Sequence, residues 1–223
     1  MGERVTFKAN GREASGYLAR PQGTGPGVVV IQEWWGLVPQ IERVADRFAA
    51  AGLVALAPDL YHGQSTKSPD QAGKLMMSLR IDEAEKDLRG AVDFLRHHPA
   101  VKGRVGTVGF CMGGALSLFA ACRNPDVGAA VVFYGGHPNV KPDLASLKAP
   151  VLGLYAGLDT FVTPELVAGL DATLTSLGKR HHFQLYPNAQ HAFFNEDRPE
   201  VYDQAAAADA WTRTLGFLRA ELT

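Results

Sequence analysis

A cysteine lies between two glycines in the stretch GFCMG (109–113), where an apolar run gives way to a helical pattern. This spacing matches the G-x-S-x-G nucleophile elbow, a sharp strand-to-helix turn, with cysteine in place of serine. Side chains two residues to either side would collide with such a turn, and the positive end of the following helix favours a thiolate. Cys111 is therefore a candidate nucleophile, and the alternative is a small buried thiol that packs among glycines.

Two further residues could complete a catalytic triad. Asp159 and His191 follow Cys111 in the order nucleophile, acid, histidine that hydrolases with this elbow use. His191 could exchange a proton with the sulfur while Asp159 holds the other ring nitrogen. Two alternatives stay open: His191 as a solvated or capping residue, and Asp159 as the organiser of the turn before the helix cap at Thr163 and Pro164.

The elements that must position these residues alternate along the chain. Apolar runs typical of strands are separated by helical patterns, which predicts a mostly parallel sheet covered by helices on both faces. Two short stretches, 4–9 and 16–20, read as an antiparallel edge hairpin whose strands are separated by residues 10–15. Further strands are expected at 27–32, 53–58, 104–110, 129–135, 149–157 and 181–187, and helices at 39–51, 69–79, 81–97, 112–122, 164–177 and 200–221.

Polar or reactive residues follow most of these expected strands, which matters because ligands gather at the carboxyl ends of strands in open α/β sheets. They are Glu33, Asp59, Cys111, Tyr134, Asp159 and His191. No linker or composition shift divides the chain, so residues 1–223 are expected to form a single domain with a sheet of about eight strands.

Composition narrows the remaining possibilities. The net charge of the 223 residues is -1 and no long basic run occurs, so neither nucleic acid nor a membrane surface is an expected partner. No segment has the length of a signal peptide core or a membrane span, which favours the cytoplasm. Cys111 and Cys122 lie in an expected turn and the helix after it, so a disulfide between them is not expected. We expect no metal or cofactor, and a monomer or a homodimer.

The chain resembles the dienelactone hydrolase family, which are α/β-hydrolases with a Cys-His-Asp triad. The resemblance rests on the segments QEWWG, GFCMGG, FYGG, GLDTFV and HAFFN and covers nearly the whole chain. It implies that Cys111 is the nucleophile, His191 the base and Asp159 the orienting acid. It also implies that Glu33 contacts the resting thiol and helps to deprotonate it when substrate arrives.

The same resemblance suggests how a substrate is held. The backbone N–H groups of Met112 and Trp34 would form the oxyanion hole. Trp35 and Tyr134 match positions of the family's pocket, and we expect Phe193 and Arg198 to bind substrate as well.

The chain departs from the family where the substrate carboxylate is clamped by arginines. The position four residues after the catalytic histidine is Asn195, and the other clamp arginine and a pocket tyrosine are replaced around Pro69 and Gly73. Lys74, Arg80 or Arg198 could compensate, but solvation at the protein surface is the favoured explanation for each of these charges. The prediction is a cofactor-free hydrolase of small carboxylic esters or lactones that acts through an acyl-thioenzyme. The alternatives are a non-catalytic α/β binding protein and a thiol redox sensor.

Overall fold

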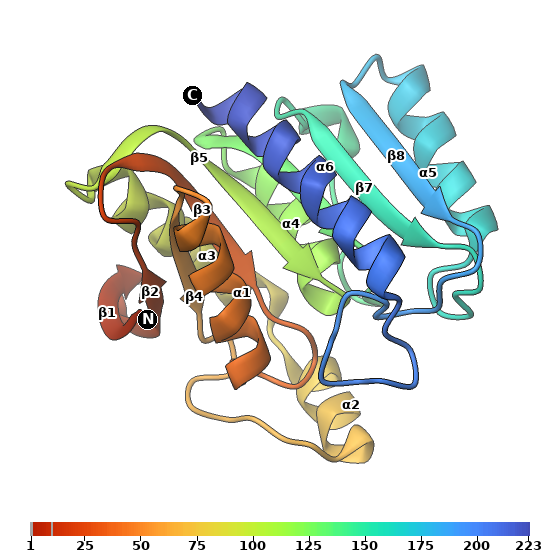
Figure 1. Ribbon diagram of the computed structural model, residues 1–223, viewed down its shortest axis with the longest axis horizontal. Helices are drawn as coiled ribbons and strands as arrows, with labels where there is room; N and C mark the ends of the chain where they lie inside the picture. Colours follow the sequence, from red (N-terminus) through yellow and green to blue (C-terminus); the bar gives the residue numbers. More distant parts are fainter. Residues whose placement is uncertain (1, 10) are drawn as a thin grey trace.

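A computed structural model describes residues 2–9 and 11–223 (Figure 1). Its centre is an eight-stranded sheet in the order β1-β2-β4-β3-β5-β6-β7-β8, parallel throughout except for the antiparallel pairs β1–β2 and β2–β4. The strands are β1 (Glu3–Ala9), β2 (Arg12–Ala19), β3 (Gly25–Ile31), β4 (Val54–Pro58), β5 (Val101–Phe110), β6 (Val127–Phe133), β7 (Val151–Ala156) and β8 (His181–Tyr186).

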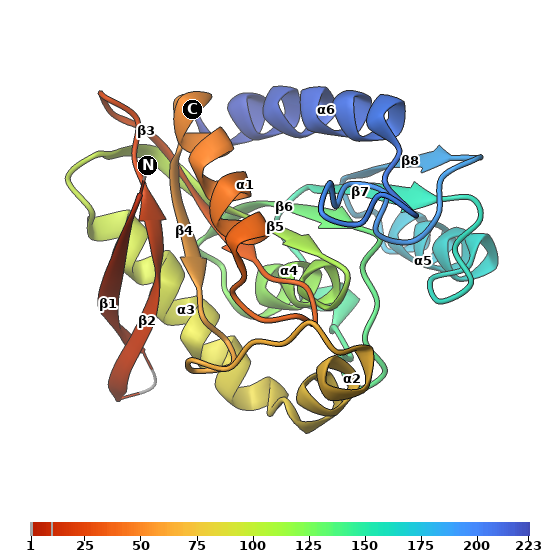
Figure 2. The same ribbon diagram turned by 60° about the horizontal axis from the view of Figure 1, so that its bottom comes forward.

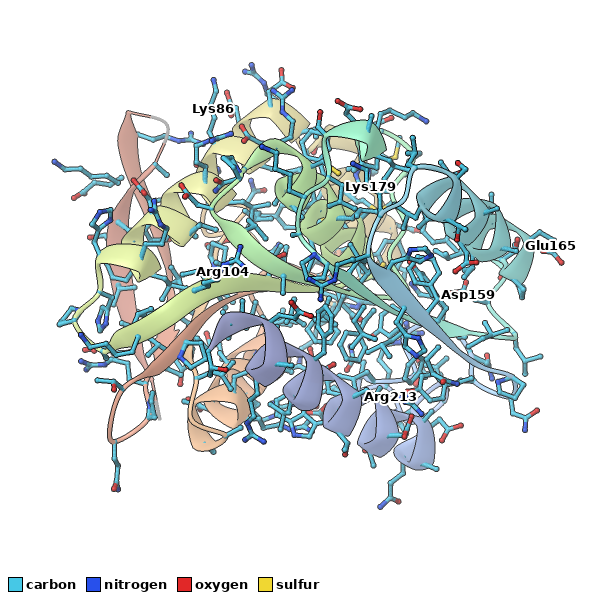
Figure 3. All side chains as sticks on the ribbon, turned by 90° about the horizontal axis from the view of Figure 1, so that it is seen from above. Lys86, Arg104, Asp159, Glu165, Lys179 and Arg213 are labelled. Carbon is cyan, nitrogen blue, oxygen red and sulfur yellow. The ribbon has the colours of Figure 1, made fainter. Side chains whose placement is uncertain are left out.

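Helices cover both faces of the sheet, as Figures 2 and 3 show from two further directions. One face packs against α1 and α6, and the other packs against α3, α4 and α5. The helices are α1 (Pro39–Ala50), α2 (Pro69–Ser78), α3 (Ile81–His97), α4 (Met112–Arg123), α5 (Pro164–Ser176) and α6 (Gln204–Leu222), with a 3-10 turn at Leu144–Ser146. None of the helices in this part of the chain is long and apolar enough to span a bilayer.

Burial explains why the central strands read as uninterrupted apolar runs. All seven residues of β3 are buried, since helices cover the sheet on both sides. Edge strand β1 instead alternates between exposed and buried residues near its end. The mostly parallel sheet with helices on both faces confirms the predicted architecture.

Two local predictions need correction. The edge hairpin is tighter than predicted: β2 begins at Arg12, which pairs with Ala9, because the stretch 12–15 continues the ladder instead of forming a loop. Asn10, which was predicted to lie in that loop, is outside the described residues. The last helix begins at Gln204 and not at residue 200. Asp203 fixes this start as the N-cap, since its carboxylate accepts the N–H groups of Ala205 and Ala206.

The topology places a crevice between β3 and β5. The chain leaves β3 through α1 to β4 on one side, and then returns through α2 and α3 to β5 on the other side of β3. Such a reversal of strand order opens a site at the carboxyl ends of the two strands. Figure 1 shows α2 and the long connection before α6 at this end of the sheet. Glu33 follows β3 and Cys111 follows β5.

Candidate active site

The turn between β5 and α4 has the geometry of a nucleophile elbow. Cys111 occupies the N-cap position of α4 with φ 52° and ψ -119°, a region that non-glycine residues rarely adopt. A Cβ atom on Gly109 would lie 1.9 Å from the carbonyl oxygen of Gly113, and one on Gly113 would lie 2.4 Å from that of Ile31. Both glycines are therefore required by close backbone approach.

Backbone hydrogen bonds hold the strained cysteine. Its N–H donates to the Phe133 carbonyl at 3.0 Å, and its own carbonyl accepts the N–H of Gly114 at 2.9 Å and of Gly136 at 3.2 Å. The Cys111 side chain lies at the start of α4, where the helix dipole favours a negative charge. Such backbone strain costs about 1–3 kcal/mol, and packing alone does not require it. The strained conformation therefore favours a functional role for Cys111 over a packing role.

His191 and Asp159 come together although they lie 32 positions apart along the chain. His191 Nδ1 lies 2.6 Å from Asp159 Oδ2. The other carboxylate oxygen, Oδ1, accepts the backbone N–H groups of Phe161 and Val162, both at 2.8 Å. Asp159 thus fulfils both roles that the sequence left open, because one oxygen organises the turn and the other holds the imidazole.

The surroundings of His191 favour its protonated form. Burial alone would lower the pKa of His191, but the hydrogen bond to Asp159 and the contact with the Cys111 side chain raise that pKa to about 10. The charged imidazolium is therefore favoured, and it lies beside the sulfur of Cys111.

Glu33 is buried beside this pair with two hydrogen-bond donors. Tyr134 donates its hydroxyl to Oε1 at 3.2 Å, and Asn195 donates its amide to Oε2 at 2.8 Å. Burial raises the pKa of Glu33, while these two hydrogen bonds and the nearby charges of His191 and Arg198 lower it in part. A carboxylate in this environment is suited to take up a proton transiently.

These groups share a cavity of about 250 Å³, which we call the Cys111 cavity. It is lined by Glu33, Trp34, Met76, Cys111, Phe161, His191, Ala192 and Arg198. Met76 comes from α2, which therefore closes one side of the cavity. Gly73 of the same helix faces the Trp34 ring, and a Cβ atom there would be in ordinary contact with it at 3.9 Å.

Three residues that were predicted to contact substrate do not line this cavity. Tyr134 and Phe193 are completely buried in an aromatic cluster, with ring centroids 5.3 Å apart. Trp35 packs edge-on against Trp34, which does line the cavity, with ring centroids 5.0 Å apart. Tyr134 instead reaches the site through its hydrogen bond to Glu33 and through its ring, which stands edge-on to His191 with centroids 5.1 Å apart. Trp35 reaches it through Arg198, whose guanidinium lies 5.9 Å from its ring centroid.

The structure distinguishes among the cationic residues near the cavity. Lys74 is exposed on α2, and Arg80 is exposed and paired with Glu83 at 3.0 Å. Arg198 lines the cavity, although its Nε also donates to Glu200 at 2.8 Å. Arg198 is therefore the one of these three candidates that is placed to meet a substrate carboxylate.

The two backbone N–H groups proposed for the oxyanion hole are available to bind a substrate oxygen. Within residues 2–9 and 11–223, neither the Met112 N–H nor the Trp34 N–H donates to another protein group. Both residues flank site residues, Met112 after Cys111 and Trp34 after Glu33.

Sequence reasoning missed Met76 and Phe161 as cavity residues and Asn195 as a partner of Glu33. Phe161 follows Asp159 by two residues, so its position after a strand was a usable signal. Asn195 lies 162 positions from Glu33, and nothing local in the sequence pairs them.

The second cysteine is remote from this site. Cys122 lies eleven residues along α4, about 16 Å at the rise of an α-helix, whereas disulfide-bonded Cα atoms are about 4.4–6.8 Å apart. Burial also raises the pKa of Cys122 to about 11. A redox sensor in which Cys122 resolves an oxidised Cys111 does not fit these positions.

A mostly parallel eight-stranded sheet, a nucleophile elbow and an acid-histidine pair at the strand ends define an α/β-hydrolase. The model of the "Dienelactone hydrolase family" matches residues 14–222, and the chain belongs to that family. Membership makes it a carboxylic ester hydrolase.

Relatives and solved structures agree with this assignment. "Protein usf" of Aquifex pyrophilus is 40% identical over 232 residues, and a "Putative carboxymethylenebutenolidase" of Aquifex aeolicus is 35% identical over 230 residues; both alignments span 100% of each chain. The crystal structure of a "Putative Dienelactone Hydrolase" from Klebsiella pneumoniae superposes with a TM-score of 0.89 at 29% identity, covering 97% of both chains.

Proposed function

We propose that this protein, as one domain, hydrolyses small carboxylic esters or lactones through an acyl-thioenzyme on Cys111. The observation that carries the proposal is the Asp159–His191 hydrogen bond of 2.6 Å beside a cysteine held in a strained elbow. The names of the relatives support this substrate class, and the arrangement favours catalysis over a binding protein with a packing cysteine.

The reaction would proceed in two halves. The Cys111 thiolate attacks the substrate carbonyl carbon, while the N–H groups of Met112 and Trp34 hold the oxyanion. The ester C–O bond then breaks, and the leaving oxygen takes a proton from the His191 imidazolium. Neutral His191 next accepts a proton from water as the water attacks the thioester, which releases the carboxylic acid and regenerates the sulfur.

Arg198 would give the cavity a preference for an acidic substrate group, since its guanidinium lines the cavity together with the His191 imidazolium. Asn195 cannot replace a clamp arginine, because it is buried and its amide is bound to Glu33. A bidentate contact between arginine and carboxylate is strong and selective, so we propose a weaker preference for carboxylate-bearing lactones than a two-arginine clamp provides.

The acyl-thioenzyme itself is the first thing to test. Wild-type protein mixed with an aryl acetate and quenched in acid should carry one acetyl group, on the peptide that contains Cys111. Peptide mass spectrometry gives the position, and Cys122→Ala is the control that should label equally. Acetylation on any other residue, or turnover with no acylated peptide at early times, would contradict the thioester route.

Glu33 is proposed to accept the thiol proton as substrate binds, so Glu33→Gln should lower kcat/KM for aryl acetate about 100-fold. Glutamine keeps both hydrogen bonds, since its oxygen can accept from Asn195 and its amide can donate to the Tyr134 oxygen. Folding stability should rise by about 1 kcal/mol at neutral pH, because a buried carboxylate no longer has to ionise.

The sign of this effect follows from the raised pKa of Glu33. A raised pKa stabilises the folded state below the carboxyl's ordinary value of 4.5, and that contribution is lost as the pH rises through the folded-state value. Denaturant unfolding at several pH values should therefore show the advantage of Glu33→Gln growing with pH. Glu13→Gln, at an exposed position, is the control and should change neither kcat/KM nor the pH dependence of stability. If Glu33→Gln had the same kcat/KM as Glu13→Gln, Glu33 would have no part in the mechanism.

A further inference from the structure

A second cavity, of about 410 Å³, lies against the first and has no part in the chemistry described above. We call it the α5 cavity, because one wall is formed by Leu166, Val167 and Leu170 of α5. The opposite wall comes from Leu118 of α4 and from Val140 in the loop after β6. Its volume falls within the roughly 300–1,000 Å³ of small-molecule sites, whereas the Cys111 cavity is smaller than that range.

The wall of the α5 cavity is suited to hydrocarbon. Its polar side chains among the described residues are His137, Lys141 and Tyr155. Both ring nitrogens of His137 already have partners, the carbonyl of Met76 and the N–H of Asn139, and Lys141 is exposed at the rim. An apolar chain could therefore enter without stripping water from an unpaired charge.

Phe161 is the partition between the two cavities, since its side chain lines both. On one side its ring stands edge-on to His191, with centroids 5.6 Å apart and an interplanar angle of 89°. On the other side it packs over Gly136, where a Cβ atom would lie 3.0 Å from Cε1. Gly136 in turn donates its N–H to the Cys111 carbonyl, so the floor beside the partition adjoins the nucleophile.

The partition is fixed at its backbone and free at its ring. The Phe161 N–H is held by Asp159 at 2.8 Å, yet 47% of the residue is exposed. A ring with this exposure can change rotamer with little loss of packing, whereas its Cα cannot move without disturbing Asp159.

Given the proposed ester hydrolysis, we infer that the α5 cavity binds the aliphatic chain of the leaving alcohol and that Phe161 controls entry to it. His191 must protonate the leaving oxygen, so that oxygen lies within hydrogen-bond reach of the imidazole. An aliphatic chain attached to that oxygen begins beside Phe161. The α5 cavity opens on the other side of the Phe161 ring. The acyl carbon instead remains at Cys111 between the two oxyanion donors.

Acetates of primary alcohols from methyl to hexyl measure this subsite. A fully buried methylene group contributes about fourfold to binding, so kcat/KM of the wild type should rise at least about tenfold from ethyl to hexyl acetate. Leu166→Trp, which fills the α5 cavity from an exposed helix position, should lower the hexyl-to-methyl ratio about tenfold. Phe161→Ala should raise this ratio by at least about threefold, because the two cavities then join. Leu177→Trp at the end of α5, outside both cavities, is the matched control and should leave the ratio unchanged.

The inverse series, methyl esters of lengthening acids, separates the two ends of the substrate. If Leu166→Trp acts on this series and not on the acetates, the cavity holds the acyl chain and the inference is wrong.

A binding measurement keeps the test independent of turnover. In methyl NMR, 1-hexanol should shift the signals of Leu118, Val140 and Val167 in the wild type, and less so in Leu166→Trp. Failure of all ester hydrolysis with these shifts present would refute the proposed function alone. Hydrolysis of methyl acetate without the shifts, or with a ratio insensitive to Leu166→Trp, would refute the subsite alone.

Discussion

Cys111→Ala is expected to lower kcat/KM for a small activated aryl ester by about 10⁴-fold or more, which leaves essentially no turnover. Alanine removes the sulfur that would form the acyl-enzyme and keeps the Cβ atom, so the elbow backbone is retained. The loss should therefore appear in kcat, with the folded structure intact by circular dichroism. The assay is release of the aryl alcohol at neutral pH.

Cys122→Ala is the matched control, since both cysteines are buried and both belong to the same strand-end turn and helix. It leaves a small cavity, and about 1 kcal/mol of stability should be lost with turnover retained. Retained activity in Cys111→Ala would exclude the elbow cysteine as nucleophile. Equal loss in both variants would show that the effect is structural.

Much of this fold could be predicted from periodicity because each central strand is covered on both faces. The buried runs of β3, β6 and β7 consist of apolar residues with few exceptions, and helices α1 and α3 each carry one apolar face. The hairpin was harder, since the largely polar stretch 12–15 extends β2 beyond its pairing with β4, where it pairs with edge strand β1 alone. Near the edge of a sheet, polar residues occur both in paired strands and in loops, so their polarity does not distinguish the two.

The gathering of the candidate site residues was predictable for a related reason. Parallel strands bring their carboxyl ends to one edge of the sheet, so residues that follow strands gather there whatever their separation along the chain. The directions of the side chains are a different matter. Trp34 and Trp35 are adjacent, yet Trp34 lines the cavity and Trp35 does not.

Similarly, Tyr134 has a positive φ of 38° that directs its hydroxyl to Glu33, a contact across 101 positions. Such directions depend on tertiary packing, because a loop side chain takes the rotamer that its distant neighbours leave open. The gathering of these residues could therefore be inferred from strand order, whereas the side chains that line the cavity could be inferred only in part, as Arg198 was.

Asp159→Asn is expected to lower kcat/KM about 10³–10⁴-fold while leaving the shape of the site in place. The asparagine oxygen would keep the N–H groups of Phe161 and Val162, which turns its amide NH₂ toward His191 Nδ1. That donor can be satisfied only if Nδ1 accepts, so the ring proton moves to Nε2, which faces the thiol. His191 would then be unable to take a proton on the side where the chemistry needs it.

The matched control is Asp203→Asn, because Asp203 also accepts two backbone N–H groups, two and three residues ahead, through one oxygen. Asparagine is an equally good N-cap, so stability and turnover should both be retained. If Asp203→Asn lost a comparable amount of activity, the effect of Asp159→Asn would be explained by disorder of the loop and not by the loss of its contact with His191.

Titration of His191 connects this variant to its cause. In the wild type, the hydrogen bond to Asp159 contributes to a His191 pKa of about 10. A raised pKa adds stability that is complete below the ordinary value of 6.5 and is lost as the pH rises toward 10. In Asp159→Asn the His191 pKa should fall toward 6.5, and the decline of stability between these two pH values should flatten. The NMR signal of the imidazole Cε1–H measures the His191 pKa directly. If activity were lost while the His191 titration stayed unchanged, Asp159 would affect the rate through the loop that it organises. The charge that it places beside His191 would then have no part in the effect.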